Sequence, residues 1–190
     1  MKRAIHIGLI GHKFMGKAHS HALRDLAMFF DPGVQPVMQT LCGVGDDLEE
    51  TARRYGWLST TSRWQDVVAD PAIDAVSILT PGRLHCEMAL AAAANGKHIL
   101  CEKPLALDAG EAARMYAAAE AAGIRHMVNF NYRRVPAVAL ARQWIEEGRL
   151  GRIFHIRCSY QQDWPLDPET PFVWRFDKSV AGAGSMADKG

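Results

Sequence analysis

The 190-residue chain lacks an excess of charge of either sign, a pattern of paired cysteines and a long hydrophobic run. Lysine plus arginine number 22 against 21 for aspartate plus glutamate, so the formal net charge is +1. This balance offers no basic surface to nucleic acid or to an anionic membrane, and neither is expected as a partner. The first apolar segment is only about seven residues long, too short for a signal peptide core or a membrane span.

Cysteine is scarce, and no two of the residues have the C-x-x-C spacing of a zinc site. They are scattered and mostly lie within apolar runs, which is typical of a reduced, intracellular protein. The four are Cys42, Cys86, Cys101 and Cys158. Three histidines, His12, His19 and His21, lie close together in the sequence, but no acidic or cysteine ligand joins them. We therefore predict a cytoplasmic protein with no metal site.

Short apolar runs alternate with longer helix-like segments over the first 130 residues. The helix-like segments end at strong breaks such as Asp31-Pro32-Gly33, Gly56 and Gly123. Repetition of strand, helix and strand predicts βαβ units, hence an α/β fold with a parallel sheet and right-handed crossovers. The predicted strands cover residues 5–10, 37–44, 73–79, 98–101 and 125–130.

The pattern changes after residue 130, where we place a domain boundary. Residues 136–147 have the spacing of one amphipathic helix. Residues 152–162 alternate with a two-residue period, which predicts a half-buried strand. Residues 1–130 are therefore expected to form the first domain, and residues 131–190 the incomplete start of a second, α+β domain.

A glycine-containing turn follows the first predicted strand directly: Gly11-His12-Lys13-Phe14-Met15-Gly16. A dinucleotide-binding fingerprint has G-x-G-x-x-G at this place, and Lys13 stands where the middle glycine belongs. The first and third glycines remain, and the amino terminus of the following helix offers free N–H groups and a favourable dipole to phosphate. The turn is therefore predicted to hold the pyrophosphate of a dinucleotide, with help from the charge of Lys13.

The same residues overlap a second motif, because residues 11–17 also fit G-x-x-x-x-G-K, the start of a phosphate-binding P-loop. That motif needs a hydroxyl side chain next, for magnesium, and this chain has Ala18. No predicted strand ends in an aspartate that would hold magnesium. A nucleotide hydrolase is therefore disfavoured.

The choice between NAD and NADP depends on the end of the second predicted strand. NAD sites place an acidic residue there for the ribose hydroxyls, about 20 residues beyond the glycine motif. Here Asp46 comes 30 residues after Gly16, and either Asp46 or Asp47 is also expected to cap the helix that ends at Gly56. No arginine or lysine stands at this strand end to meet a 2′-phosphate, so the sequence favours NAD.

Polar residues follow two further predicted strands. The strand over 98–101 delivers Glu102-Lys103-Pro104 at its carboxyl end, and Thr80-Pro81 ends the strand before it. Ligands of open parallel sheets bind in the crevice outside the carboxyl ends of the strands, so both segments are expected to contact a ligand. The alternative for Glu102 and Lys103 is a surface ion pair that closes a strand.

Several motifs occur in a fixed order along essentially the whole chain. They are Phe14-Met15-Gly16-Lys17-Ala18-His19, Ile73-Asp74-Ala75-Val76, Thr80-Pro81 with His85, Gly96-Lys97-His98, Glu102-Lys103-Pro104-Leu105, and Trp174-Arg175-Phe176 before the glycine-rich segment that ends at Asp188. This order resembles the Gfo/Idh/MocA oxidoreductase family of sugar and inositol dehydrogenases. Gln162-Asp163-Trp164 is similar to the branch that contains levoglucosan-type and inositol-type dehydrogenases.

The resemblance implies a Rossmann-type doubly wound parallel sheet and a dehydrogenase that transfers hydride between NAD or NADP and a sugar, inositol or related polyol. Lys103 would be the base for the hydroxyl proton or would polarise the substrate oxygen. Pro104 would fix the turn that presents Lys103, through a cis peptide bond. Glu102 would hold the ribose or nicotinamide, and His85 would either stack near the nicotinamide or cap the next helix.

The resemblance also concerns the end of the chain. Asp188 would pair, as a proton relay or substrate anchor, with a histidine that the family has four residues later, beyond Gly190. Family members continue through a sheet that usually forms the subunit interface, so a full-length form is expected to be a homo-oligomer. We expect the chain to be a fragment of a longer protein or a natural truncation. Two functions stay open: a polyol dehydrogenase, and a non-catalytic dinucleotide-binding module or inactive fragment.

Overall fold

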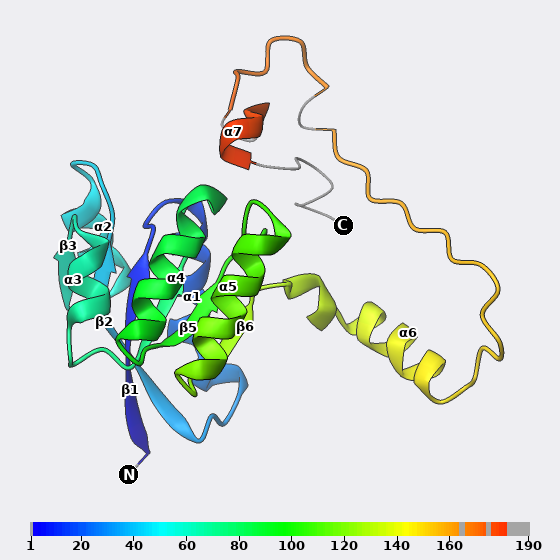
Figure 1. Cartoon of the computed structure of the whole chain (residues 1–190), viewed down its shortest axis with the longest axis horizontal. Helices are drawn as coiled ribbons and strands as arrows, with labels where there is room; N and C mark the ends of the chain where they lie inside the picture. Colours follow the sequence, from blue (N-terminus) through cyan, green and yellow to red (C-terminus); the bar gives the residue numbers. More distant parts are fainter. Residues whose placement is uncertain (1, 164–165, 174–175, 182–190) are drawn as a thin grey trace.

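The computed structural model describes residues 2–163, 166–173 and 176–181. Six parallel strands form one sheet in the order β3-β2-β1-β4-β5-β6 (Figure 1). The chain runs outward from β1 to β3 and then returns to β4 on the other side of β1, which is the doubly wound arrangement that we predicted. The strands are β1 (Arg3–Ile10), β2 (Val34–Cys42), β3 (Ser59–Thr61), β4 (Ala75–Ile78), β5 (His98–Cys101) and β6 (His126–Val128).

Helices cover both faces of the sheet, and each face has its own cluster of buried side chains. Leu9 and Leu41 pack with α1 and α2, whereas Ile10 and Val76 pack with α3, α4 and α5. Burial of both faces explains why the strands have apolar runs rather than strict alternation. The helices are α1 (Phe14–Phe29), α2 (Leu48–Tyr55), α3 (Trp64–Ala69), α4 (His85–Ala94) after the 3-10 turn η1 (Gly82–Leu84), and α5 (Ala109–Ala121). Within the described ranges, no helix has the length and apolar character needed to cross a bilayer.

Local signals set most of the element ends. Helix α2 begins after Asp47 and ends at Gly56, whose φ of 90° lies in the left-handed region that favours glycine. This confirms the predicted helix and its end at Gly56, whereas Asp47 stands at the N-cap position without a side-chain hydrogen bond to the helix. The short elements β3 and α3 were not predicted, because three strand residues are too few to show a period.

The carboxyl ends of the parallel strands meet at one edge of the sheet. The residues that follow β1, β2 and β4 there are Gly11, Gly43 and Leu79-Thr80. Glu102 follows β5, and Asn129 follows β6. The residues that follow five of the six strands are thereby brought to the edge at which such sheets bind ligands.

The segment after residue 130 is organised differently. It contains η2 (Asn131–Arg134), the predicted amphipathic helix as α6 (Pro136–Glu146), and a short α7 (Lys178–Ala181) that contacts η1. All side chains from 131 to 163 are exposed, and α6 with the following residues extends away from the sheet (Figure 1).

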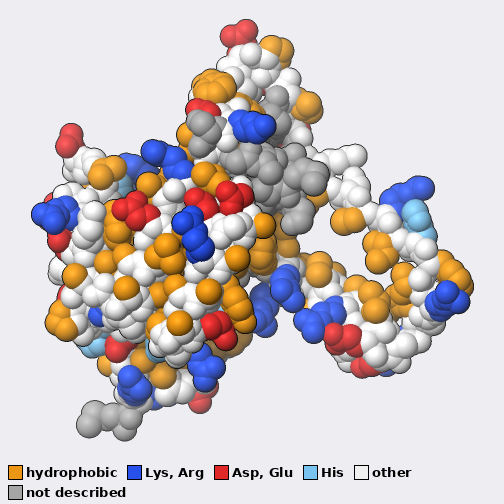
Figure 2. Space-filling model, viewed as in Figure 1, with side chains coloured by type: hydrophobic (Ala, Val, Ile, Leu, Met, Phe, Trp, Pro, Cys, Tyr) orange, Lys and Arg blue, Asp and Glu red, His pale blue; other side chains and the backbone are white. Residues whose placement is uncertain are grey.

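The predicted strand over 152–162 is wrong for the described structure, in which these residues are extended but form no ladder. A strand needs a neighbour for its backbone N–H and C=O groups, and the described part of the chain offers none there. Apolar side chains of this segment therefore stay exposed, with Phe154 at 84% and Ile156 at 77%. Figure 2 shows hydrophobic side chains along the part of the chain that extends away from the sheet.

Candidate functional site

A cavity of about 460 Å³ opens at the carboxyl edge of the sheet, next to β1, β2 and β4. The strand order reverses here, which is the place where open α/β sheets bind ligands. Its lining includes two segments singled out in the sequence, the turn over residues 11–16 and Thr80-Pro81. The side chains of Trp64, Leu84 and Met88 add an apolar wall.

The first and third glycines of the turn are required by close packing. Gly11 has φ of 115°, and a Cβ there would lie 3.0 Å from the carbonyl oxygen of Leu79. A Cβ on Gly16 would lie 2.4 Å from the carbonyl oxygen of Gly11, so any side chain would push the turn and α1 apart. No side chain caps the amino terminus of α1, and its first turn has no acidic residue. The backbone N–H groups there therefore suit phosphate.

Lys13, at the position of the missing glycine, points its charge across the turn to the end of β2. Its Nζ donates hydrogen bonds to both carboxylate oxygens of Asp47, at 2.7 and 2.8 Å. The Nε2 of His12 lies 3.0 Å from the same carboxylate. The ring of His12 is buried against Gly43, where a Cβ would lie 2.0 Å from Nδ1. The turn is thus tied to the β2 edge by an ion pair that spacing did not predict.

Asp47 rather than Asp46 takes part in this contact. Hydrogen bonds from Lys13 and then from His12 lower the pKa of Asp47 to about 2, so the carboxylate is ionised at neutral pH. Asp46 is exposed and stands outside this ion pair. The acidic group that the structure connects to the glycine turn is therefore one residue later than the one we had assigned to the ribose.

His85 ties two loops of the cleft edge together. Its ring is 1% exposed, with Nε2 2.7 Å from the carbonyl oxygen of Thr80 and Nδ1 3.0 Å from that of Pro104. Carbonyl oxygens only accept hydrogen bonds, so whichever ring nitrogen carries the proton donates to one of them. The ring lies between the loop after β4 and the loop after β5 and contacts both. The two roles expected for His85, a ring beside the nicotinamide or a helix cap, stay predictions.

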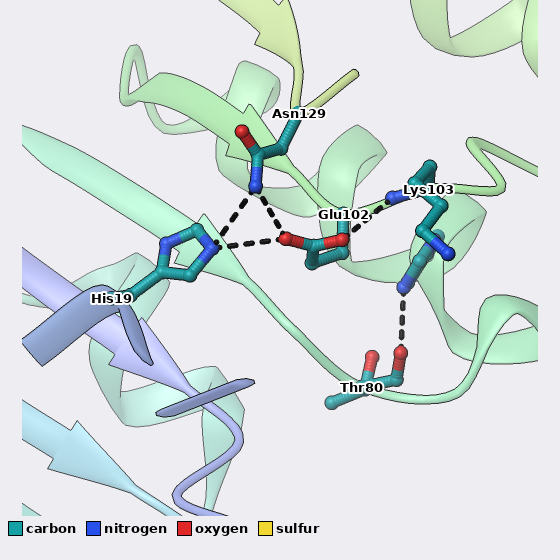
Figure 3. Close-up of polar contacts among 6 residues, drawn as sticks. His19, Thr80, Glu102, Lys103 and Asn129 are labelled. Carbon is teal, nitrogen blue, oxygen red and sulfur yellow. Dashed lines mark hydrogen bonds and ion pairs between the residues drawn. The ribbon is translucent and has the colours of Figure 1, made fainter. Parts of the chain in front are cut away.

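Glu102 is buried at the end of β5, with 5% exposure, and both of its oxygens are occupied by donors of the chain (Figure 3). Oε1 accepts from His19 Nε2 at 2.9 Å and from Asn129 Nδ2 at 2.6 Å. Oε2 accepts from the backbone N–H of Lys103 at 3.1 Å. The carboxylate thus joins α1, the end of β6 and the loop that carries Lys103.

Two opposite effects act on the pKa of Glu102. Burial raises it, and the hydrogen bonds from His19, Asn129 and the backbone of Lys103 lower it. The hydrogen bonds prevail, so the pKa lies below its ordinary value of 4.5 and Glu102 is an anion at neutral pH. The surrounding donors therefore make a charge tolerable in a site that water barely reaches.

Lys103 follows Glu102 on the same loop and is partly buried (Figure 3). Its peptide bond to Pro104 is cis, as the proline suggested. The contact of His19 with Glu102 places this loop next to α1, the helix that begins in the glycine turn. The two segments that the sequence marked separately therefore belong to one edge of the sheet.

Sequence reasoning missed the roles of His19 and Asn129. His19 was considered as one of three neighbouring histidines and as the last residue of a family motif, and Asn129 was not singled out. One signal was available for Asn129, because it directly follows a predicted strand at the ligand edge. His19 had no comparable local signal, since its partner Glu102 is 83 positions away.

The later family motif, with its tryptophan and its aspartate, has no described position. Asp188, Trp174 and Arg175 fall outside the described residues. Among the residues that are described, no three of histidine, cysteine, aspartate and glutamate come together as ligands for a metal ion.

Comparison with known proteins gives clear relatives. The chain is 50% identical over 186 residues to levoglucosan dehydrogenase of Pseudarthrobacter phenanthrenivorans, which covers 97% of this chain and 48% of the relative. A solved levoglucosan dehydrogenase in complex with NADH and levoglucosan has a TM-score of 0.94 at 50% identity, covering 98% of this chain and 51% of that one. scyllo-Inositol 2-dehydrogenase (NAD(+)) of Bacillus subtilis is 37% identical over 121 residues, 62% of this chain and 35% of the relative. The chain thus spans about half the length of the levoglucosan dehydrogenase that it matches.

Two family descriptions cover most of the chain. "Oxidoreductase family, NAD-binding Rossmann fold" matches residues 5–130, and "GFO/IDH/MocA C-terminal domain" matches residues 138–190. The first match alone covers more than half of the chain, and it agrees with the strand order and the glycine turn described above. The chain therefore belongs to the Gfo/Idh/MocA family of oxidoreductases, as its motifs suggested.

Proposed function

We propose that the chain is the cofactor-binding part of a dehydrogenase that transfers hydride between a nicotinamide cofactor and a sugar, inositol or related polyol. The observation that carries this proposal is the buried contact of Glu102 with His19. It brings the Lys103 loop next to the helix that begins in the glycine turn. One cleft edge therefore combines a phosphate-binding turn with an amine that suits proton transfer.

The residues present fit a dinucleotide. The turn over residues 11–16 has the two glycines that allow close approach, and the start of α1 has uncapped N–H groups for the pyrophosphate. Thr80-Pro81 lines the same cavity, and the apolar wall of Trp64, Leu84 and Met88 suits the flat face of a base. Nicotinamide, when bound, would supply the hydride acceptor or donor.

Lys103 is our candidate for the proton transfer in this reaction. In the oxidation direction, the amine at Nζ would take the proton of the substrate hydroxyl as the C–H bond breaks and its electron pair leaves with the hydride. The product is the carbonyl compound, and the proton passes from Nζ to water. In the reduction direction, Lys103 would return the proton to the carbonyl oxygen. Asp188 is a second candidate, as an anchor for a substrate hydroxyl.

NAD is the proposed cofactor rather than NADP. The support is the ionised carboxylate of Asp47 at the end of β2, with Asp46 directly before it. Carboxylates there favour ribose hydroxyls and repel a 2′-phosphate. Lys13 is committed to Asp47 by two hydrogen bonds, which leaves its charge partly neutralised. Titration with NADH and NADPH, followed by cofactor fluorescence, is expected to give tighter binding of NADH.

The substrate class, assembly and location are parts of the same proposal. A sugar or polyol is supported by relatives named for levoglucosan and scyllo-inositol. A homo-oligomer is supported by the exposed apolar side chains of α6 and of residues 152–163, which need a covering surface. A cytoplasmic location is supported by the four free cysteines.

The test uses a polypeptide that contains this chain and spans both family domains in full, here called the two-domain protein. We expect it to bind NADH and to reduce NAD with levoglucosan or an inositol. Lys103→Ala should lower kcat by about 10²- to 10⁴-fold, the usual contribution of a general base, with little change in NADH affinity.

Each result bears on a separate part of the proposal. Unchanged kcat in Lys103→Ala would show that another group moves the proton. Absence of NADH binding by the unaltered protein would contradict the dinucleotide site. NADH binding with no turnover of any sugar or polyol would favour the alternative, a non-catalytic dinucleotide-binding module.

A further inference from the structure

Glu102 has no oxygen that is left without a donor from the chain itself. His19 and Asn129 both donate to Oε1, and the backbone N–H of Lys103 donates to Oε2. The side chain is 6% exposed, and that of His19 is 11% exposed. Such a carboxylate is arranged to hold its neighbours in place, which differs from the direct role toward ribose or nicotinamide expected from the motif.

The three donors come from elements that are far apart in the sequence. His19 lies on α1, one turn beyond Gly16 of the glycine turn, and Asn129 follows β6. Lys103 lies on the loop after β5 (Figure 3). A single buried anion therefore fixes the relative positions of the phosphate-binding helix, the last strand and the backbone of Lys103.

We propose that His19 and Asn129 are positioning residues for hydride transfer: they hold the Glu102 carboxylate so that it fixes the backbone from which Lys103 reaches the substrate. The proposal rests on the proposed function, because it takes Lys103 as the base. It assigns no contact with cofactor or substrate to His19 or Asn129.

Hydrogen-bond chemistry supports this division of roles. Nε2 of His19 lies 2.9 Å from the Glu102 carboxylate, which only accepts, so Nε2 carries the proton and donates it to Oε1. The amide Nδ2 of Asn129, 3.4 Å from Nε2, is itself a donor and does not compete for that proton. The amide of Asn129 then donates to the same oxygen. Without these two donors, a buried carboxylate would be strongly disfavoured and would take up a proton. A protonated Glu102 would hold the N–H of Lys103 less firmly, since a neutral acceptor makes the weaker hydrogen bond.

The groups that face Glu102 determine the direction in which the pH profile of kcat should move when His19 is replaced. The titratable ones are His19 on α1, Cys101 on β5 and Lys103 on the next loop, while Asn129 is neutral. Burial, and then the charge of Glu102, raise the pKa of Cys101 to about 12, so its thiol stays neutral. Loss of the His19 donor removes one of the hydrogen bonds that lower the pKa of Glu102, so this pKa rises. The acidic limb of the pH profile of kcat should therefore move to higher pH in the variant.

The experiment compares His19→Leu, His19→Gln and Asn129→Ala in the two-domain protein. Misplacement of a reacting group by about 1 Å costs on the order of 10²-fold in rate, so we expect kcat to fall 10- to 100-fold in His19→Leu and Asn129→Ala. NADH affinity should change less than about threefold, since neither residue is assigned to the cofactor. His19→Gln keeps an N–H donor and should recover most of kcat and the original acidic limb.

The matched control is His21→Ala, on the same helix. His21 is 76% exposed and pairs with Asp25, so its removal should leave both kcat and NADH affinity unchanged. A general loss of helix stability would lower kcat on substitution of either His19 or His21, whereas the proposed role predicts a loss only on substitution of His19. If His19→Leu does not fold, Asn129→Ala and the pH profile of His19→Gln decide the question.

Three outcomes would overturn the proposal. One is unchanged kcat and pH profile in both Asn129→Ala and His19→Leu. Another is a fall in NADH affinity of tenfold or more with kcat intact, which would place His19 in the cofactor site. The third is equal loss in His19→Gln and His19→Leu, which would mean that the donor is irrelevant. Full activity of Lys103→Ala would instead reject Lys103 as the base, and absence of turnover by the unaltered protein would reject the proposed function, so the failures remain distinct.

Discussion

Two histidine–carboxylate pairs lie at the carboxyl edge of the sheet, and they differ in burial. In the pair of His12 with Asp47, the carboxylate side chain is 53% exposed. In the pair of His19 with Glu102, the two side chains are 11% and 6% exposed. Water and salt screen the first pair, whereas the second acts in a medium where charges interact strongly. Similar residues thus form a pair with an exposed carboxylate beside the end of β2 and a buried pair beside the end of β5.

The comparison also explains why Lys103 is better suited to proton transfer than Lys13. Lys13 is 67% exposed and shares the carboxylate of Asp47 with His12. Lys103 is partly buried, and its backbone is held by a carboxylate that no solvent competes for. A lysine that must move a proton benefits from the second setting.

The largest contrast is expected in stability, on replacing each carboxylate in turn. Glu102→Ala leaves the N–H groups of His19, Asn129 and Lys103 without their acceptor in a buried site, and should cost about 3 kcal/mol of unfolding free energy. Asp47→Ala should cost much less, because water replaces the lost contact. Urea denaturation of both variants measures the difference, and equal losses would remove the basis of the comparison.

Close packing in the glycine turn should have the next largest effect. Gly16→Ala places a Cβ 2.4 Å from the carbonyl oxygen of Gly11, and relief of such overpacking costs about 1–3 kcal/mol. If the turn moves, NADH affinity should fall about 5- to 150-fold. The control is Gly33→Ala, which has nothing within 4 Å and should bind NADH normally. Equal affinity of the two variants would show that the turn does not hold the cofactor.

Acid should lower the stabilising contribution of each pair to the unfolding free energy, and this effect is expected to be smaller than the two above. The pKa of Glu102 is lowered below 4.5, so its stabilising effect is complete above that pH and is lost as the pH falls through the lowered value. The pKa of Asp47 falls from 3.8 to about 2, so the contribution of its pair is lost as the pH falls through about 2. The difference in unfolding free energy between the unaltered protein and Glu102→Gln should shrink steadily below about pH 4.5. If this difference in unfolding free energy grew as the pH fell, the lowered pKa of Glu102 would be contradicted.

The smallest effect concerns the choice between NADH and NADPH at the pair of His12 with Asp47. Asp47→Asn removes an anion from the end of β2 and frees Lys13, so the ratio of NADPH to NADH affinity should rise about two- to fivefold. Asp31→Asn is the control, because Asp31 is paired with Lys2 on an exposed loop. Fluorescence titration with both cofactors gives the ratio. An unchanged ratio would leave Asp46 as the better candidate for the ribose.

Features carried by one strand–turn–helix unit were predictable from the sequence. The glycine turn, the polar end of β5 and the end of α2 at Gly56 each depend on a few neighbouring residues. The doubly wound sheet followed from the repeated order of these units and the family motifs.

Features that join distant units were not predictable. The contact of His19 with Glu102 spans 83 positions, and nothing local to either residue reports it. The exchange of Asp46 for Asp47 depends on a loop conformation that spacing alone does not determine. The predicted strand over 152–162 failed because a two-residue period states which side chains would share a face, but not whether a neighbouring strand is present.

The most direct measurement is an experimental structure of the two-domain protein with NAD and a polyol bound. Our account predicts the pyrophosphate against the N–H groups of the turn over residues 11–16. It also predicts Lys103 Nζ within about 3 Å of a substrate hydroxyl, with Glu102 still held by His19 and Asn129. A complex in which the phosphates bind elsewhere, or in which Lys103 turns away from the nicotinamide, would contradict the account.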